Sequence, residues 1–231
     1  MSFLQISEAE WSVILLSVKV AVISTIISVP FAITFGWFMG RYRFRGKSVF
    51  EGIIHLPLVM PPVATGYLLL IVLGKQGFIG KLIFNWFGVQ IAFTQTAAVI
   101  AAIVVSFPLI TRSVRTSFEM VDIKLEAASR SLGISPLKTF FRISFPLAFS
   151  GILSGTILGF ARCLGEFGAT ITFAGNISGK TSTIPMAVYS NMQIPGKESA
   201  TIRLVIVSVI ISLIAMIIAE YLNRKVIRKR S

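Results

Sequence analysis

Long apolar runs alternate with short polar and mostly basic segments along the whole chain. Five of these runs approach or exceed the ~20 residues that an α-helix needs to cross the apolar core of a bilayer. Helices satisfy their own backbone hydrogen bonds in lipid, so runs of this length favour helical spans. The pattern predicts an all-α polytopic membrane protein, with residues 1–231 forming a single transmembrane domain. The expected spans cover about residues 11–40, 53–73, 91–110, 146–172 and 201–222.

The composition excludes an ordinary soluble domain. Hydrophobic residues make up 55% of the chain and charged residues 13%, with a mean hydropathy of +0.84. Soluble proteins average about 45–50% apolar and about 25% charged residues. The net charge of +13 is compatible with nucleic-acid binding, but positive loops on one side of a membrane explain it better. We therefore expect membrane lipids, and no nucleic acid, among the partners.

The basic residues are distributed asymmetrically among the segments that connect the spans. Fifteen of the 22 lysines and arginines follow the first, third and fifth apolar runs, and five lie in the other connecting segments. Segments rich in lysine and arginine stay on the cytoplasmic side of a membrane. The asymmetry predicts an outside N-terminus and a cytoplasmic C-terminus, and it places the connection at 122–146 in the cytoplasm.

The connection at 122–146 is the least apolar part of the chain. Its charges are mixed, and its apolar residues recur at helical spacing on both sides of a break at Gly133 to Pro136. Ser135 before Pro136 is typical of a helix start, where serine caps the first turn. These features predict two short helices around a turn, folded so that one face is available to a partner. The alternative is an ordinary cytosolic connection between two membrane helices.

The same segment resembles the EAA loop of ABC-importer permeases. In that family EAA is followed by three residues, a glycine, nine residues and Ile-x-Leu-Pro. Gly133, Ile143 and Pro146 fall at the family spacing. Glu126 lies seven residues before Gly133, where the common pattern has six, so Ala127 takes the usual glutamate position.

The resemblance implies the type I ABC-importer permease fold, with this coupling-helix loop inserted into a cleft on a cytosolic ATPase. A small apolar face would enter the cleft, and Glu126 and Arg130 would supply charges at its rim. The implied coupling residues are Glu126, Ala127, Ala128, Arg130, Leu132, Gly133 and Pro146.

Two further stretches, Leu56–Leu70 and Leu164–Tyr189, resemble the permease subunit of molybdate ABC importers, to which sulfate and thiosulfate permeases are related. The resemblance implies a homodimer around a central pathway, in a bacterial or archaeal cytoplasmic membrane. The implied partners are a cytosolic ABC ATPase dimer that uses ATP and Mg²⁺, and a periplasmic or lipid-anchored oxyanion-binding protein. The implied cargo is a tetrahedral oxyanion, molybdate, with a sulfate or thiosulfate permease as the alternative. Molybdate and tungstate are nearly equal in size and charge, so the sequence leaves both open.

Helix-breaking and charged residues within the apolar runs are candidates for the translocation pathway or its gate. Pro61 and Pro62 free backbone carbonyls and bend a helix, either for packing or beside a pathway. Arg162 and Glu166 stand four residues apart and can pair on one helix face. Charges at membrane depth are costly unless they are paired or hydrated, so this pair is a structural ion pair or part of a gate.

Three glycines predict a second feature of the fourth span. Gly151, Gly155 and Gly159 recur at intervals of four and therefore share one helix face. Small residues at this spacing let another helix approach closely in a membrane. We expect this face to be a packing surface, with pore lining as the alternative.

The sequence holds no constellation of residues for catalysis or metal binding, so we expect a chain that is not an enzyme and binds no cofactor. Residues 175–181, GNISGKT, have three residues between their glycines where a P-loop has four. ATP hydrolysis would then belong to a separate subunit. A stand-alone channel or ion-coupled carrier remains an alternative, with Glu166 as its one candidate for binding a coupling ion.

Overall fold

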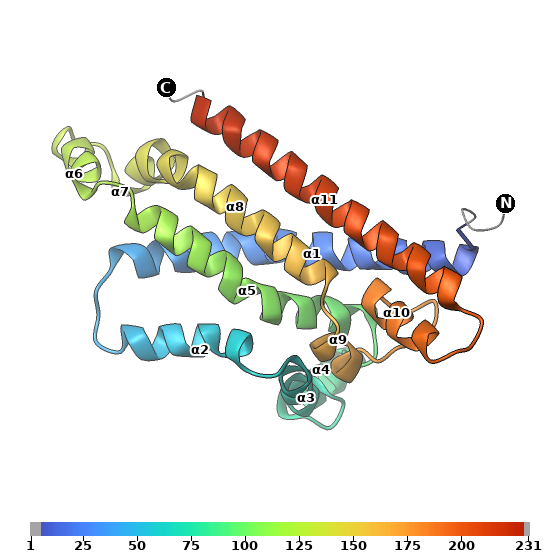
Figure 1. Cartoon of the computed structure of the whole chain (residues 1–231). Helices are drawn as coiled ribbons and strands as arrows, with labels where there is room; N and C mark the ends of the chain where they lie inside the picture. The colour runs from blue at the N-terminus through green and yellow to red at the C-terminus, as the bar shows by residue number, and fades with distance from the viewer. Residues whose placement is uncertain (1–5, 229–231) are drawn as a thin grey trace.

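The computed structural model describes residues 6–228, which form a bundle of long helices with short helices gathered at both ends (Figure 1). Four stretches are long and apolar enough to cross a membrane. The helices that form these stretches are α1 (Glu8–Arg41), α5 (Gln95–Glu119), α8 (Phe145–Leu164) and α11 (Glu198–Arg228).

A fifth apolar stretch is broken in the middle. It consists of α2 (Lys47–Val59) and α3 (Pro62–Leu73), which are bent by 113° relative to each other. No strand occurs between residues 6 and 228, so the predicted all-α class is confirmed. The remaining elements are the α-helices α4 (Phe78–Phe87), α6 (Ile123–Ser131), α7 (Pro136–Thr139), α9 (Gly168–Phe173) and α10 (Ile184–Met192), and the π-helical turn η1 (Phe140–Ser144).

The break between α2 and α3 differs from the single span expected at 53–73. Helix α2 begins earlier, at Lys47, and ends before Met60, whose backbone is extended. A residue before proline avoids the helical conformation, and the two prolines 61 and 62 have no N–H to continue the ladder. Pro57, in contrast, lies inside α2 without ending it.

Two other spans also differ from their expected bounds. The span expected at 91–110 is helical from Gln95, where Thr94 accepts a hydrogen bond from the Ala97 amide, to Glu119. Pro108 lies inside this helix without ending it. The span expected at 146–172 ends at Leu164, and a short non-helical link separates it from α9.

Helix α5 lies between α1 and α8 and forms the centre of the bundle. Its buried face is lined with alanines, which lets the neighbouring helices come close. A Cβ atom added at Gly36 of α1 would lie 2.7 Å from Val114 Cγ1, and one added at Gly155 of α8 would lie 2.7 Å from Ser113 Cβ. The glycine face of α8 is therefore a packing surface, as the sequence predicts.

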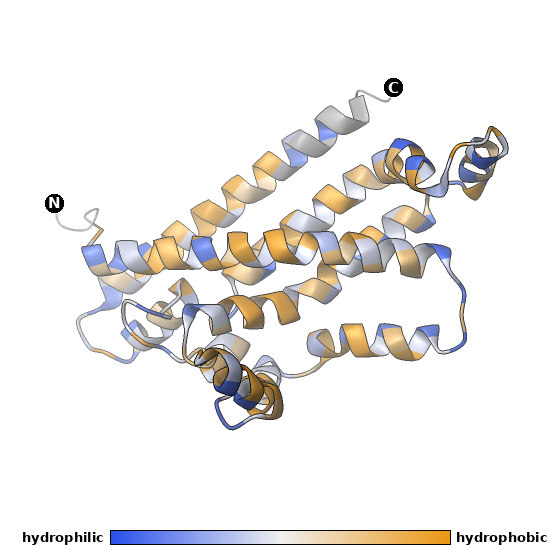
Figure 2. Ribbon diagram, turned by 180° about the vertical axis from the view of Figure 1, so that it is seen from behind, coloured by the Kyte–Doolittle hydropathy of each residue, from blue (hydrophilic) through white to orange (hydrophobic). Residues whose placement is uncertain are grey.

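Different helices gather at the two ends of the bundle. The end of α1, the start of α2, the end of α5 and the helices α6 and α7 lie at one end, and α3, α4, α9 and α10 lie at the other (Figure 1). Apolar residues dominate the long helices, whereas polar residues gather on α6 and at the helix ends (Figure 2). This distribution agrees with a bundle whose middle is surrounded by lipid.

We expect Gly155→Leu to destabilise the folded chain in detergent by about 1–3 kcal/mol, since the new side chain would overlap α5. Gly52→Leu on α2 is the matched control, because no atom lies within 4 Å of a Cβ added there. Thermal unfolding of the two purified variants checks this. An equal loss of stability in both would show that the α5–α8 contact does not set the stability.

Candidate functional site

The connection at 122–146 folds as two short helices around a turn, as expected from the sequence. Asp122 caps α6 by accepting a hydrogen bond from the Lys124 amide at 2.9 Å. Gly133 follows α6 with a φ of +80°, a conformation that glycine adopts without steric penalty. Ser135 then caps α7, whose first residue is Pro136. We call residues 122–139 the coupling loop.

A buried hydrogen bond holds the two helices of the coupling loop together. The hydroxyls of Ser129 on α6 and Thr139 on α7 lie 3.0 Å apart, and both side chains are buried. From Thr139 the chain continues through η1 directly into α8 without a loop. The coupling loop is therefore a folded unit attached to the end of a membrane helix.

Glu126 does not lie at the rim of the coupling loop, and this expectation was wrong. Its carboxylate is buried and lies 2.7 Å from the guanidinium of Arg41 at the end of α1. Ser144 donates a second hydrogen bond to the same oxygen at 2.6 Å, and Arg41 also donates to the carbonyl of Val121 at 3.1 Å. Glu126 thus fixes α6 to α1 and to η1.

The outer side of the coupling loop is apolar and exposed. Ala127, Ala128 and Arg130 are exposed, and Leu132 is 81% exposed. Ile123 and Leu137, which sequence analysis did not single out, extend the same kind of surface, with exposed fractions of 66% and 69%. Pro146 lies apart from this surface, half-buried in the first turn of α8. The residues at 123–137 therefore carry the exposed part of the candidate site.

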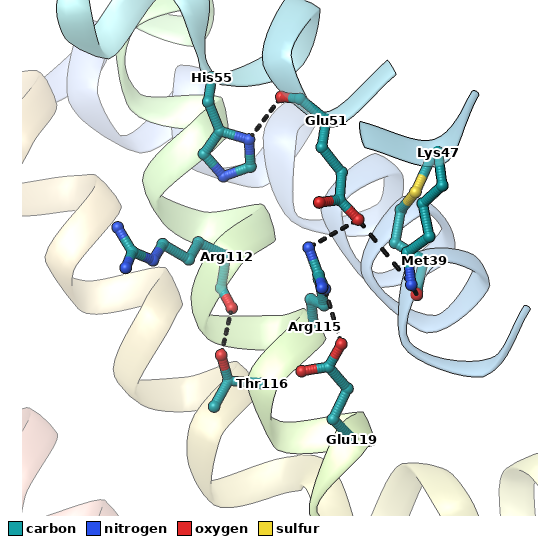
Figure 3. Close-up of polar contacts among 8 residues, drawn as sticks. All are labelled: Met39, Lys47, Glu51, His55, Arg112, Arg115, Thr116 and Glu119. Atoms are coloured by element: carbon teal, nitrogen blue, oxygen red, sulfur yellow. Dashed lines mark hydrogen bonds and ion pairs between the residues drawn. The ribbon is translucent and has the colours of Figure 1, made fainter. Parts of the chain in front are cut away.

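A second polar network joins α2 to α5 near the coupling loop (Figure 3). Arg115 lies 2.7 Å from Glu51 of α2 and 2.8 Å from Glu119, one turn further along α5. Lys47 lies 3.8 Å from the same Glu51 oxygen, and His55 Nδ1 lies 2.8 Å from the Glu51 carbonyl. No residue of α2 is buried, so this network is a principal attachment of α2 to the bundle.

The role of Glu51 was not among the features that the sequence predicted. Its partner Arg115 lies 64 positions further along the chain, and no helical or strand periodicity connects residues so far apart. The available signal was the scarcity of acidic residues, because none occurs between Glu51 and Glu119. A rare carboxylate beside an apolar run indicates a cationic partner from another helix.

The pathway candidates from two separate spans meet at the other end of the bundle. Arg162 and Glu166 form the ion pair that their spacing predicts, at 2.7 Å, and Glu166 also accepts a hydrogen bond from the Ala169 amide at 2.9 Å. A Cβ added at Gly168 would lie 2.7 Å from Pro62 Cβ. Backbone contacts between α3 and α9 thus bring the proline break next to the ion pair.

These features define a membrane transport subunit: apolar spans, one broken span and a folded loop held outside the bundle. The model of the binding-protein-dependent transport system inner membrane component family matches residues 32–228, and the chain belongs to this family.

Among its relatives, the chain is 50% identical to the molybdenum transport system permease protein ModB of Haemophilus influenzae. The match covers 95% of this chain and 96% of that protein. The chain is 44% identical to the putative molybdenum transport system permease protein YvgM of Bacillus subtilis, and this match covers 76% of the chain and 78% of YvgM. The sulfate transport system permease protein CysW of Synechocystis is 32% identical, over 90% and 76%.

The solved structures with a similar fold are chains of ABC transporters. A chain of a bacterial ABC transporter involved in alginate import superposes with a TM-score of 0.77 at 14% identity, covering 95% of this chain and 80% of that one. An inward-facing methionine transporter, MetNI, gives a TM-score of 0.68 at 16% identity, covering 96% and 99%. At these identities the likeness establishes the type I importer permease fold.

We expect Glu126→Ala to destabilise the attachment of the coupling loop by about 3–5 kcal/mol, because Arg41 would be left buried without its partner. Hydrogen exchange of residues 122–146 should rise, and the unfolding temperature should fall. Glu220→Ala is the matched control, since the Glu220–Arg224 pair is exposed and such pairs contribute about 0–1 kcal/mol. Equal effects in both variants would contradict the anchoring role of Glu126.

Proposed function

We propose that this chain is the membrane-spanning subunit of an ATP-driven importer for a tetrahedral oxyanion, with molybdate as the cargo. The main support for this proposal is the 50% identity, over nearly the whole chain, to a permease named for molybdenum transport. Sulfate permeases are more distant, at 32% identity. Tungstate, which nearly matches molybdate in size and charge, is the second candidate cargo.

The energy for import would come from a separate cytosolic ATPase dimer that binds ATP and Mg²⁺. The exposed apolar side of the coupling loop supports this part of the proposal. A helix with exposed apolar residues and a basic flank suits insertion into a groove on a partner. Two copies of the chain would form the pathway between them, and an oxyanion-binding protein would deliver cargo on the opposite side.

We infer the orientation of the chain in the membrane from the position of its basic residues. The coupling loop and the basic residues that follow α1 lie at one end of the bundle, and α3, α4, α9 and α10 lie at the other (Figure 1). We place the coupling loop in the cytoplasm, because segments rich in lysine and arginine remain on that side. The N-terminus would then lie outside and the C-terminus inside.

The geometry suggests how movement of the ATPases would reach the pathway. Force on α6 would pass through the Glu126–Arg41 pair into α1. Force would also pass from α7, at the end of the coupling loop, through η1 into α8, because these helices follow one another without a break. Because α8 ends at Leu164, next to the Arg162–Glu166 pair, its displacement would act on the contact between α3 and α9. Rigid helices carrying motion between two ends are a common basis of alternating access.

Reconstitution into liposomes tests the function directly. We expect uptake of labelled molybdate only when this chain, its cytosolic ATPase, the oxyanion-binding protein and ATP are all present. An excess of tungstate should compete, and an excess of sulfate should compete much less. Uptake by the chain alone, without the ATPase or ATP, would instead support a carrier or channel.

We expect Gly133→Asp to leave the chain folded and inserted in the membrane, but to weaken docking of the ATPase. Uptake should fall at least about tenfold, which corresponds to a loss of about 1.4 kcal/mol in docking free energy. No atom lies within 4 Å of a Cβ added at Gly133, so the change acts on the exposed turn. Gly88→Asp is the matched control, with a φ of +66° and equally free space at the opposite end of the bundle. Normal ATPase retention in Gly133→Asp would exclude this turn as the coupling element.

A further inference from the structure

Helix α4 exposes a face of large apolar side chains that the proposed transport mechanism does not use. Phe78, Ile79, Leu82 and Trp86 recur at helical spacing and share one side of the helix. All four are exposed, and the exposed fractions of Phe78 and Trp86 reach 83% and 79%. Such a contiguous apolar face indicates contact with another molecule or with the membrane.

This face cannot turn inward, because the opposite side of α4 is fixed against α3. Gly77 and Gly80 face the last turn of α3 and the turn after it so closely that a Cβ added at either would overlap backbone carbonyls there. The Gly77 amide also donates to the Gly74 carbonyl at 2.8 Å, which closes the turn between the two helices. Whatever covers the exposed face must therefore come from outside the described chain.

A cavity of about 420 Å³ opens beside the same corner, between α3, the turn that follows it and residues 90–93. Its polar part is formed by Lys75, Gln76 and Gln90, and the Lys75 ammonium lies 4.4 Å from the centroid of the Phe84 ring. The apolar lining residues are Tyr67, Leu70, Ile71, Ala92 and Phe93.

The charge at this corner is positive and uncompensated. Lys75 and Lys81 are exposed, and neither forms an ion pair within residues 6–228. No aspartate or glutamate occurs in the sequence between Glu51 and Glu119. An apolar face and an apolar cavity, each bordered by an unpaired lysine, match the two parts of an anionic phospholipid.

We propose that the corner between α3 and α4 binds an anionic glycerophospholipid of the leaflet on the side of the N-terminus. The lipid phosphate lies beside Lys75 and Lys81, and Trp86 lies at the depth of the headgroups, where tryptophan is enriched. One acyl chain follows the cavity wall along Leu70 and Ile71. The site is independent of the cargo and of the ATPase, so it stands or falls separately from the transport proposal.

Native mass spectrometry of the purified full chain with phosphatidylglycerol or phosphatidylcholine tests this proposal. A lysine near an anionic lipid surface contributes roughly a fivefold preference. We expect the wild-type chain to retain phosphatidylglycerol at least about tenfold better than phosphatidylcholine. The double variant Lys75→Gln/Lys81→Gln should fall to about twofold or less, and size-exclusion chromatography checks that it remains folded.

The matched control is Lys180→Gln/Lys197→Gln, which removes two exposed lysines outside this cavity. We expect it to keep the wild-type preference. Equal retention of both lipids by the wild-type chain, or an equal loss in both double variants, would overturn the site.

Two further outcomes would assign the corner to another occupant. Competition by millimolar glycerol 3-phosphate would make it a site for soluble phosphate esters, whereas we expect none. A Trp86→Cys variant without Cys163 reports on a protein partner, and we expect no disulfide-linked pair of chains to form on oxidation. Disulfide-linked pairs of chains would mean that a second copy covers the face.

Discussion

The close packing of α5 between α1 and α8 is the contact on which the rest of this structure depends. In lipid, burial of apolar surface gives little net driving force, so helices associate through short backbone distances and van der Waals contact. Alanines on α5 and glycines on its two neighbours supply those short distances. A side chain added at Gly36 or Gly155 would overlap α5, so the observed spacing of these helices depends on the two glycines.

This central packing positions both functional ends of the molecule. The end of α5 carries Arg115 and leads directly to the coupling loop, and its start lies beside residues 91–93 at the opposite end. Because α8 runs antiparallel to α5 and is itself continuous with the coupling loop, one rigid pair connects the two ends. In the proposed mechanism, movement at the coupling loop would be transmitted through these closely packed helices.

Ion pairs attach the less firmly packed parts to this centre. Glu126 binds Arg41, and Glu51 binds Arg115, so each pair links an outlying helix to a helix of the bundle. Desolvation offsets much of the Coulomb energy of such pairs, so their main effect is to fix where the partner lies. For α2, which has no buried residue, an ion pair is a more easily reversed attachment than a packed core.

The broken span and the Arg162–Glu166 pair form the corresponding contact at the other end. Glu166 pairs with Arg162 in α8 and accepts a hydrogen bond from the Ala169 amide in the first turn of α9. Helix α9 in turn packs against the backbone of α3. The charge, the break and the end of α8 are therefore one connected arrangement. Rearranging it would change the packing of three helices together.

Local sequence determined the features that depend on nearest neighbours along the chain. Apolar run length gave the helical class, Ser135–Pro136 and Gly133 gave the turn of the coupling loop, and a spacing of four gave the Arg162–Glu166 pair. Each follows from backbone geometry or from helical periodicity, which act over a few residues.

Tertiary structure alone decided which distant residues meet and which way a side chain points. We expected Glu126 at the rim of the coupling loop, yet it is buried against Arg41, which lies 85 positions away in the sequence. The proline pair predicted a bend but not its 113° or its contact with Gly168. Such pairings follow from how helices pack, which no local spacing encodes, since many partners are compatible with one apolar helix face.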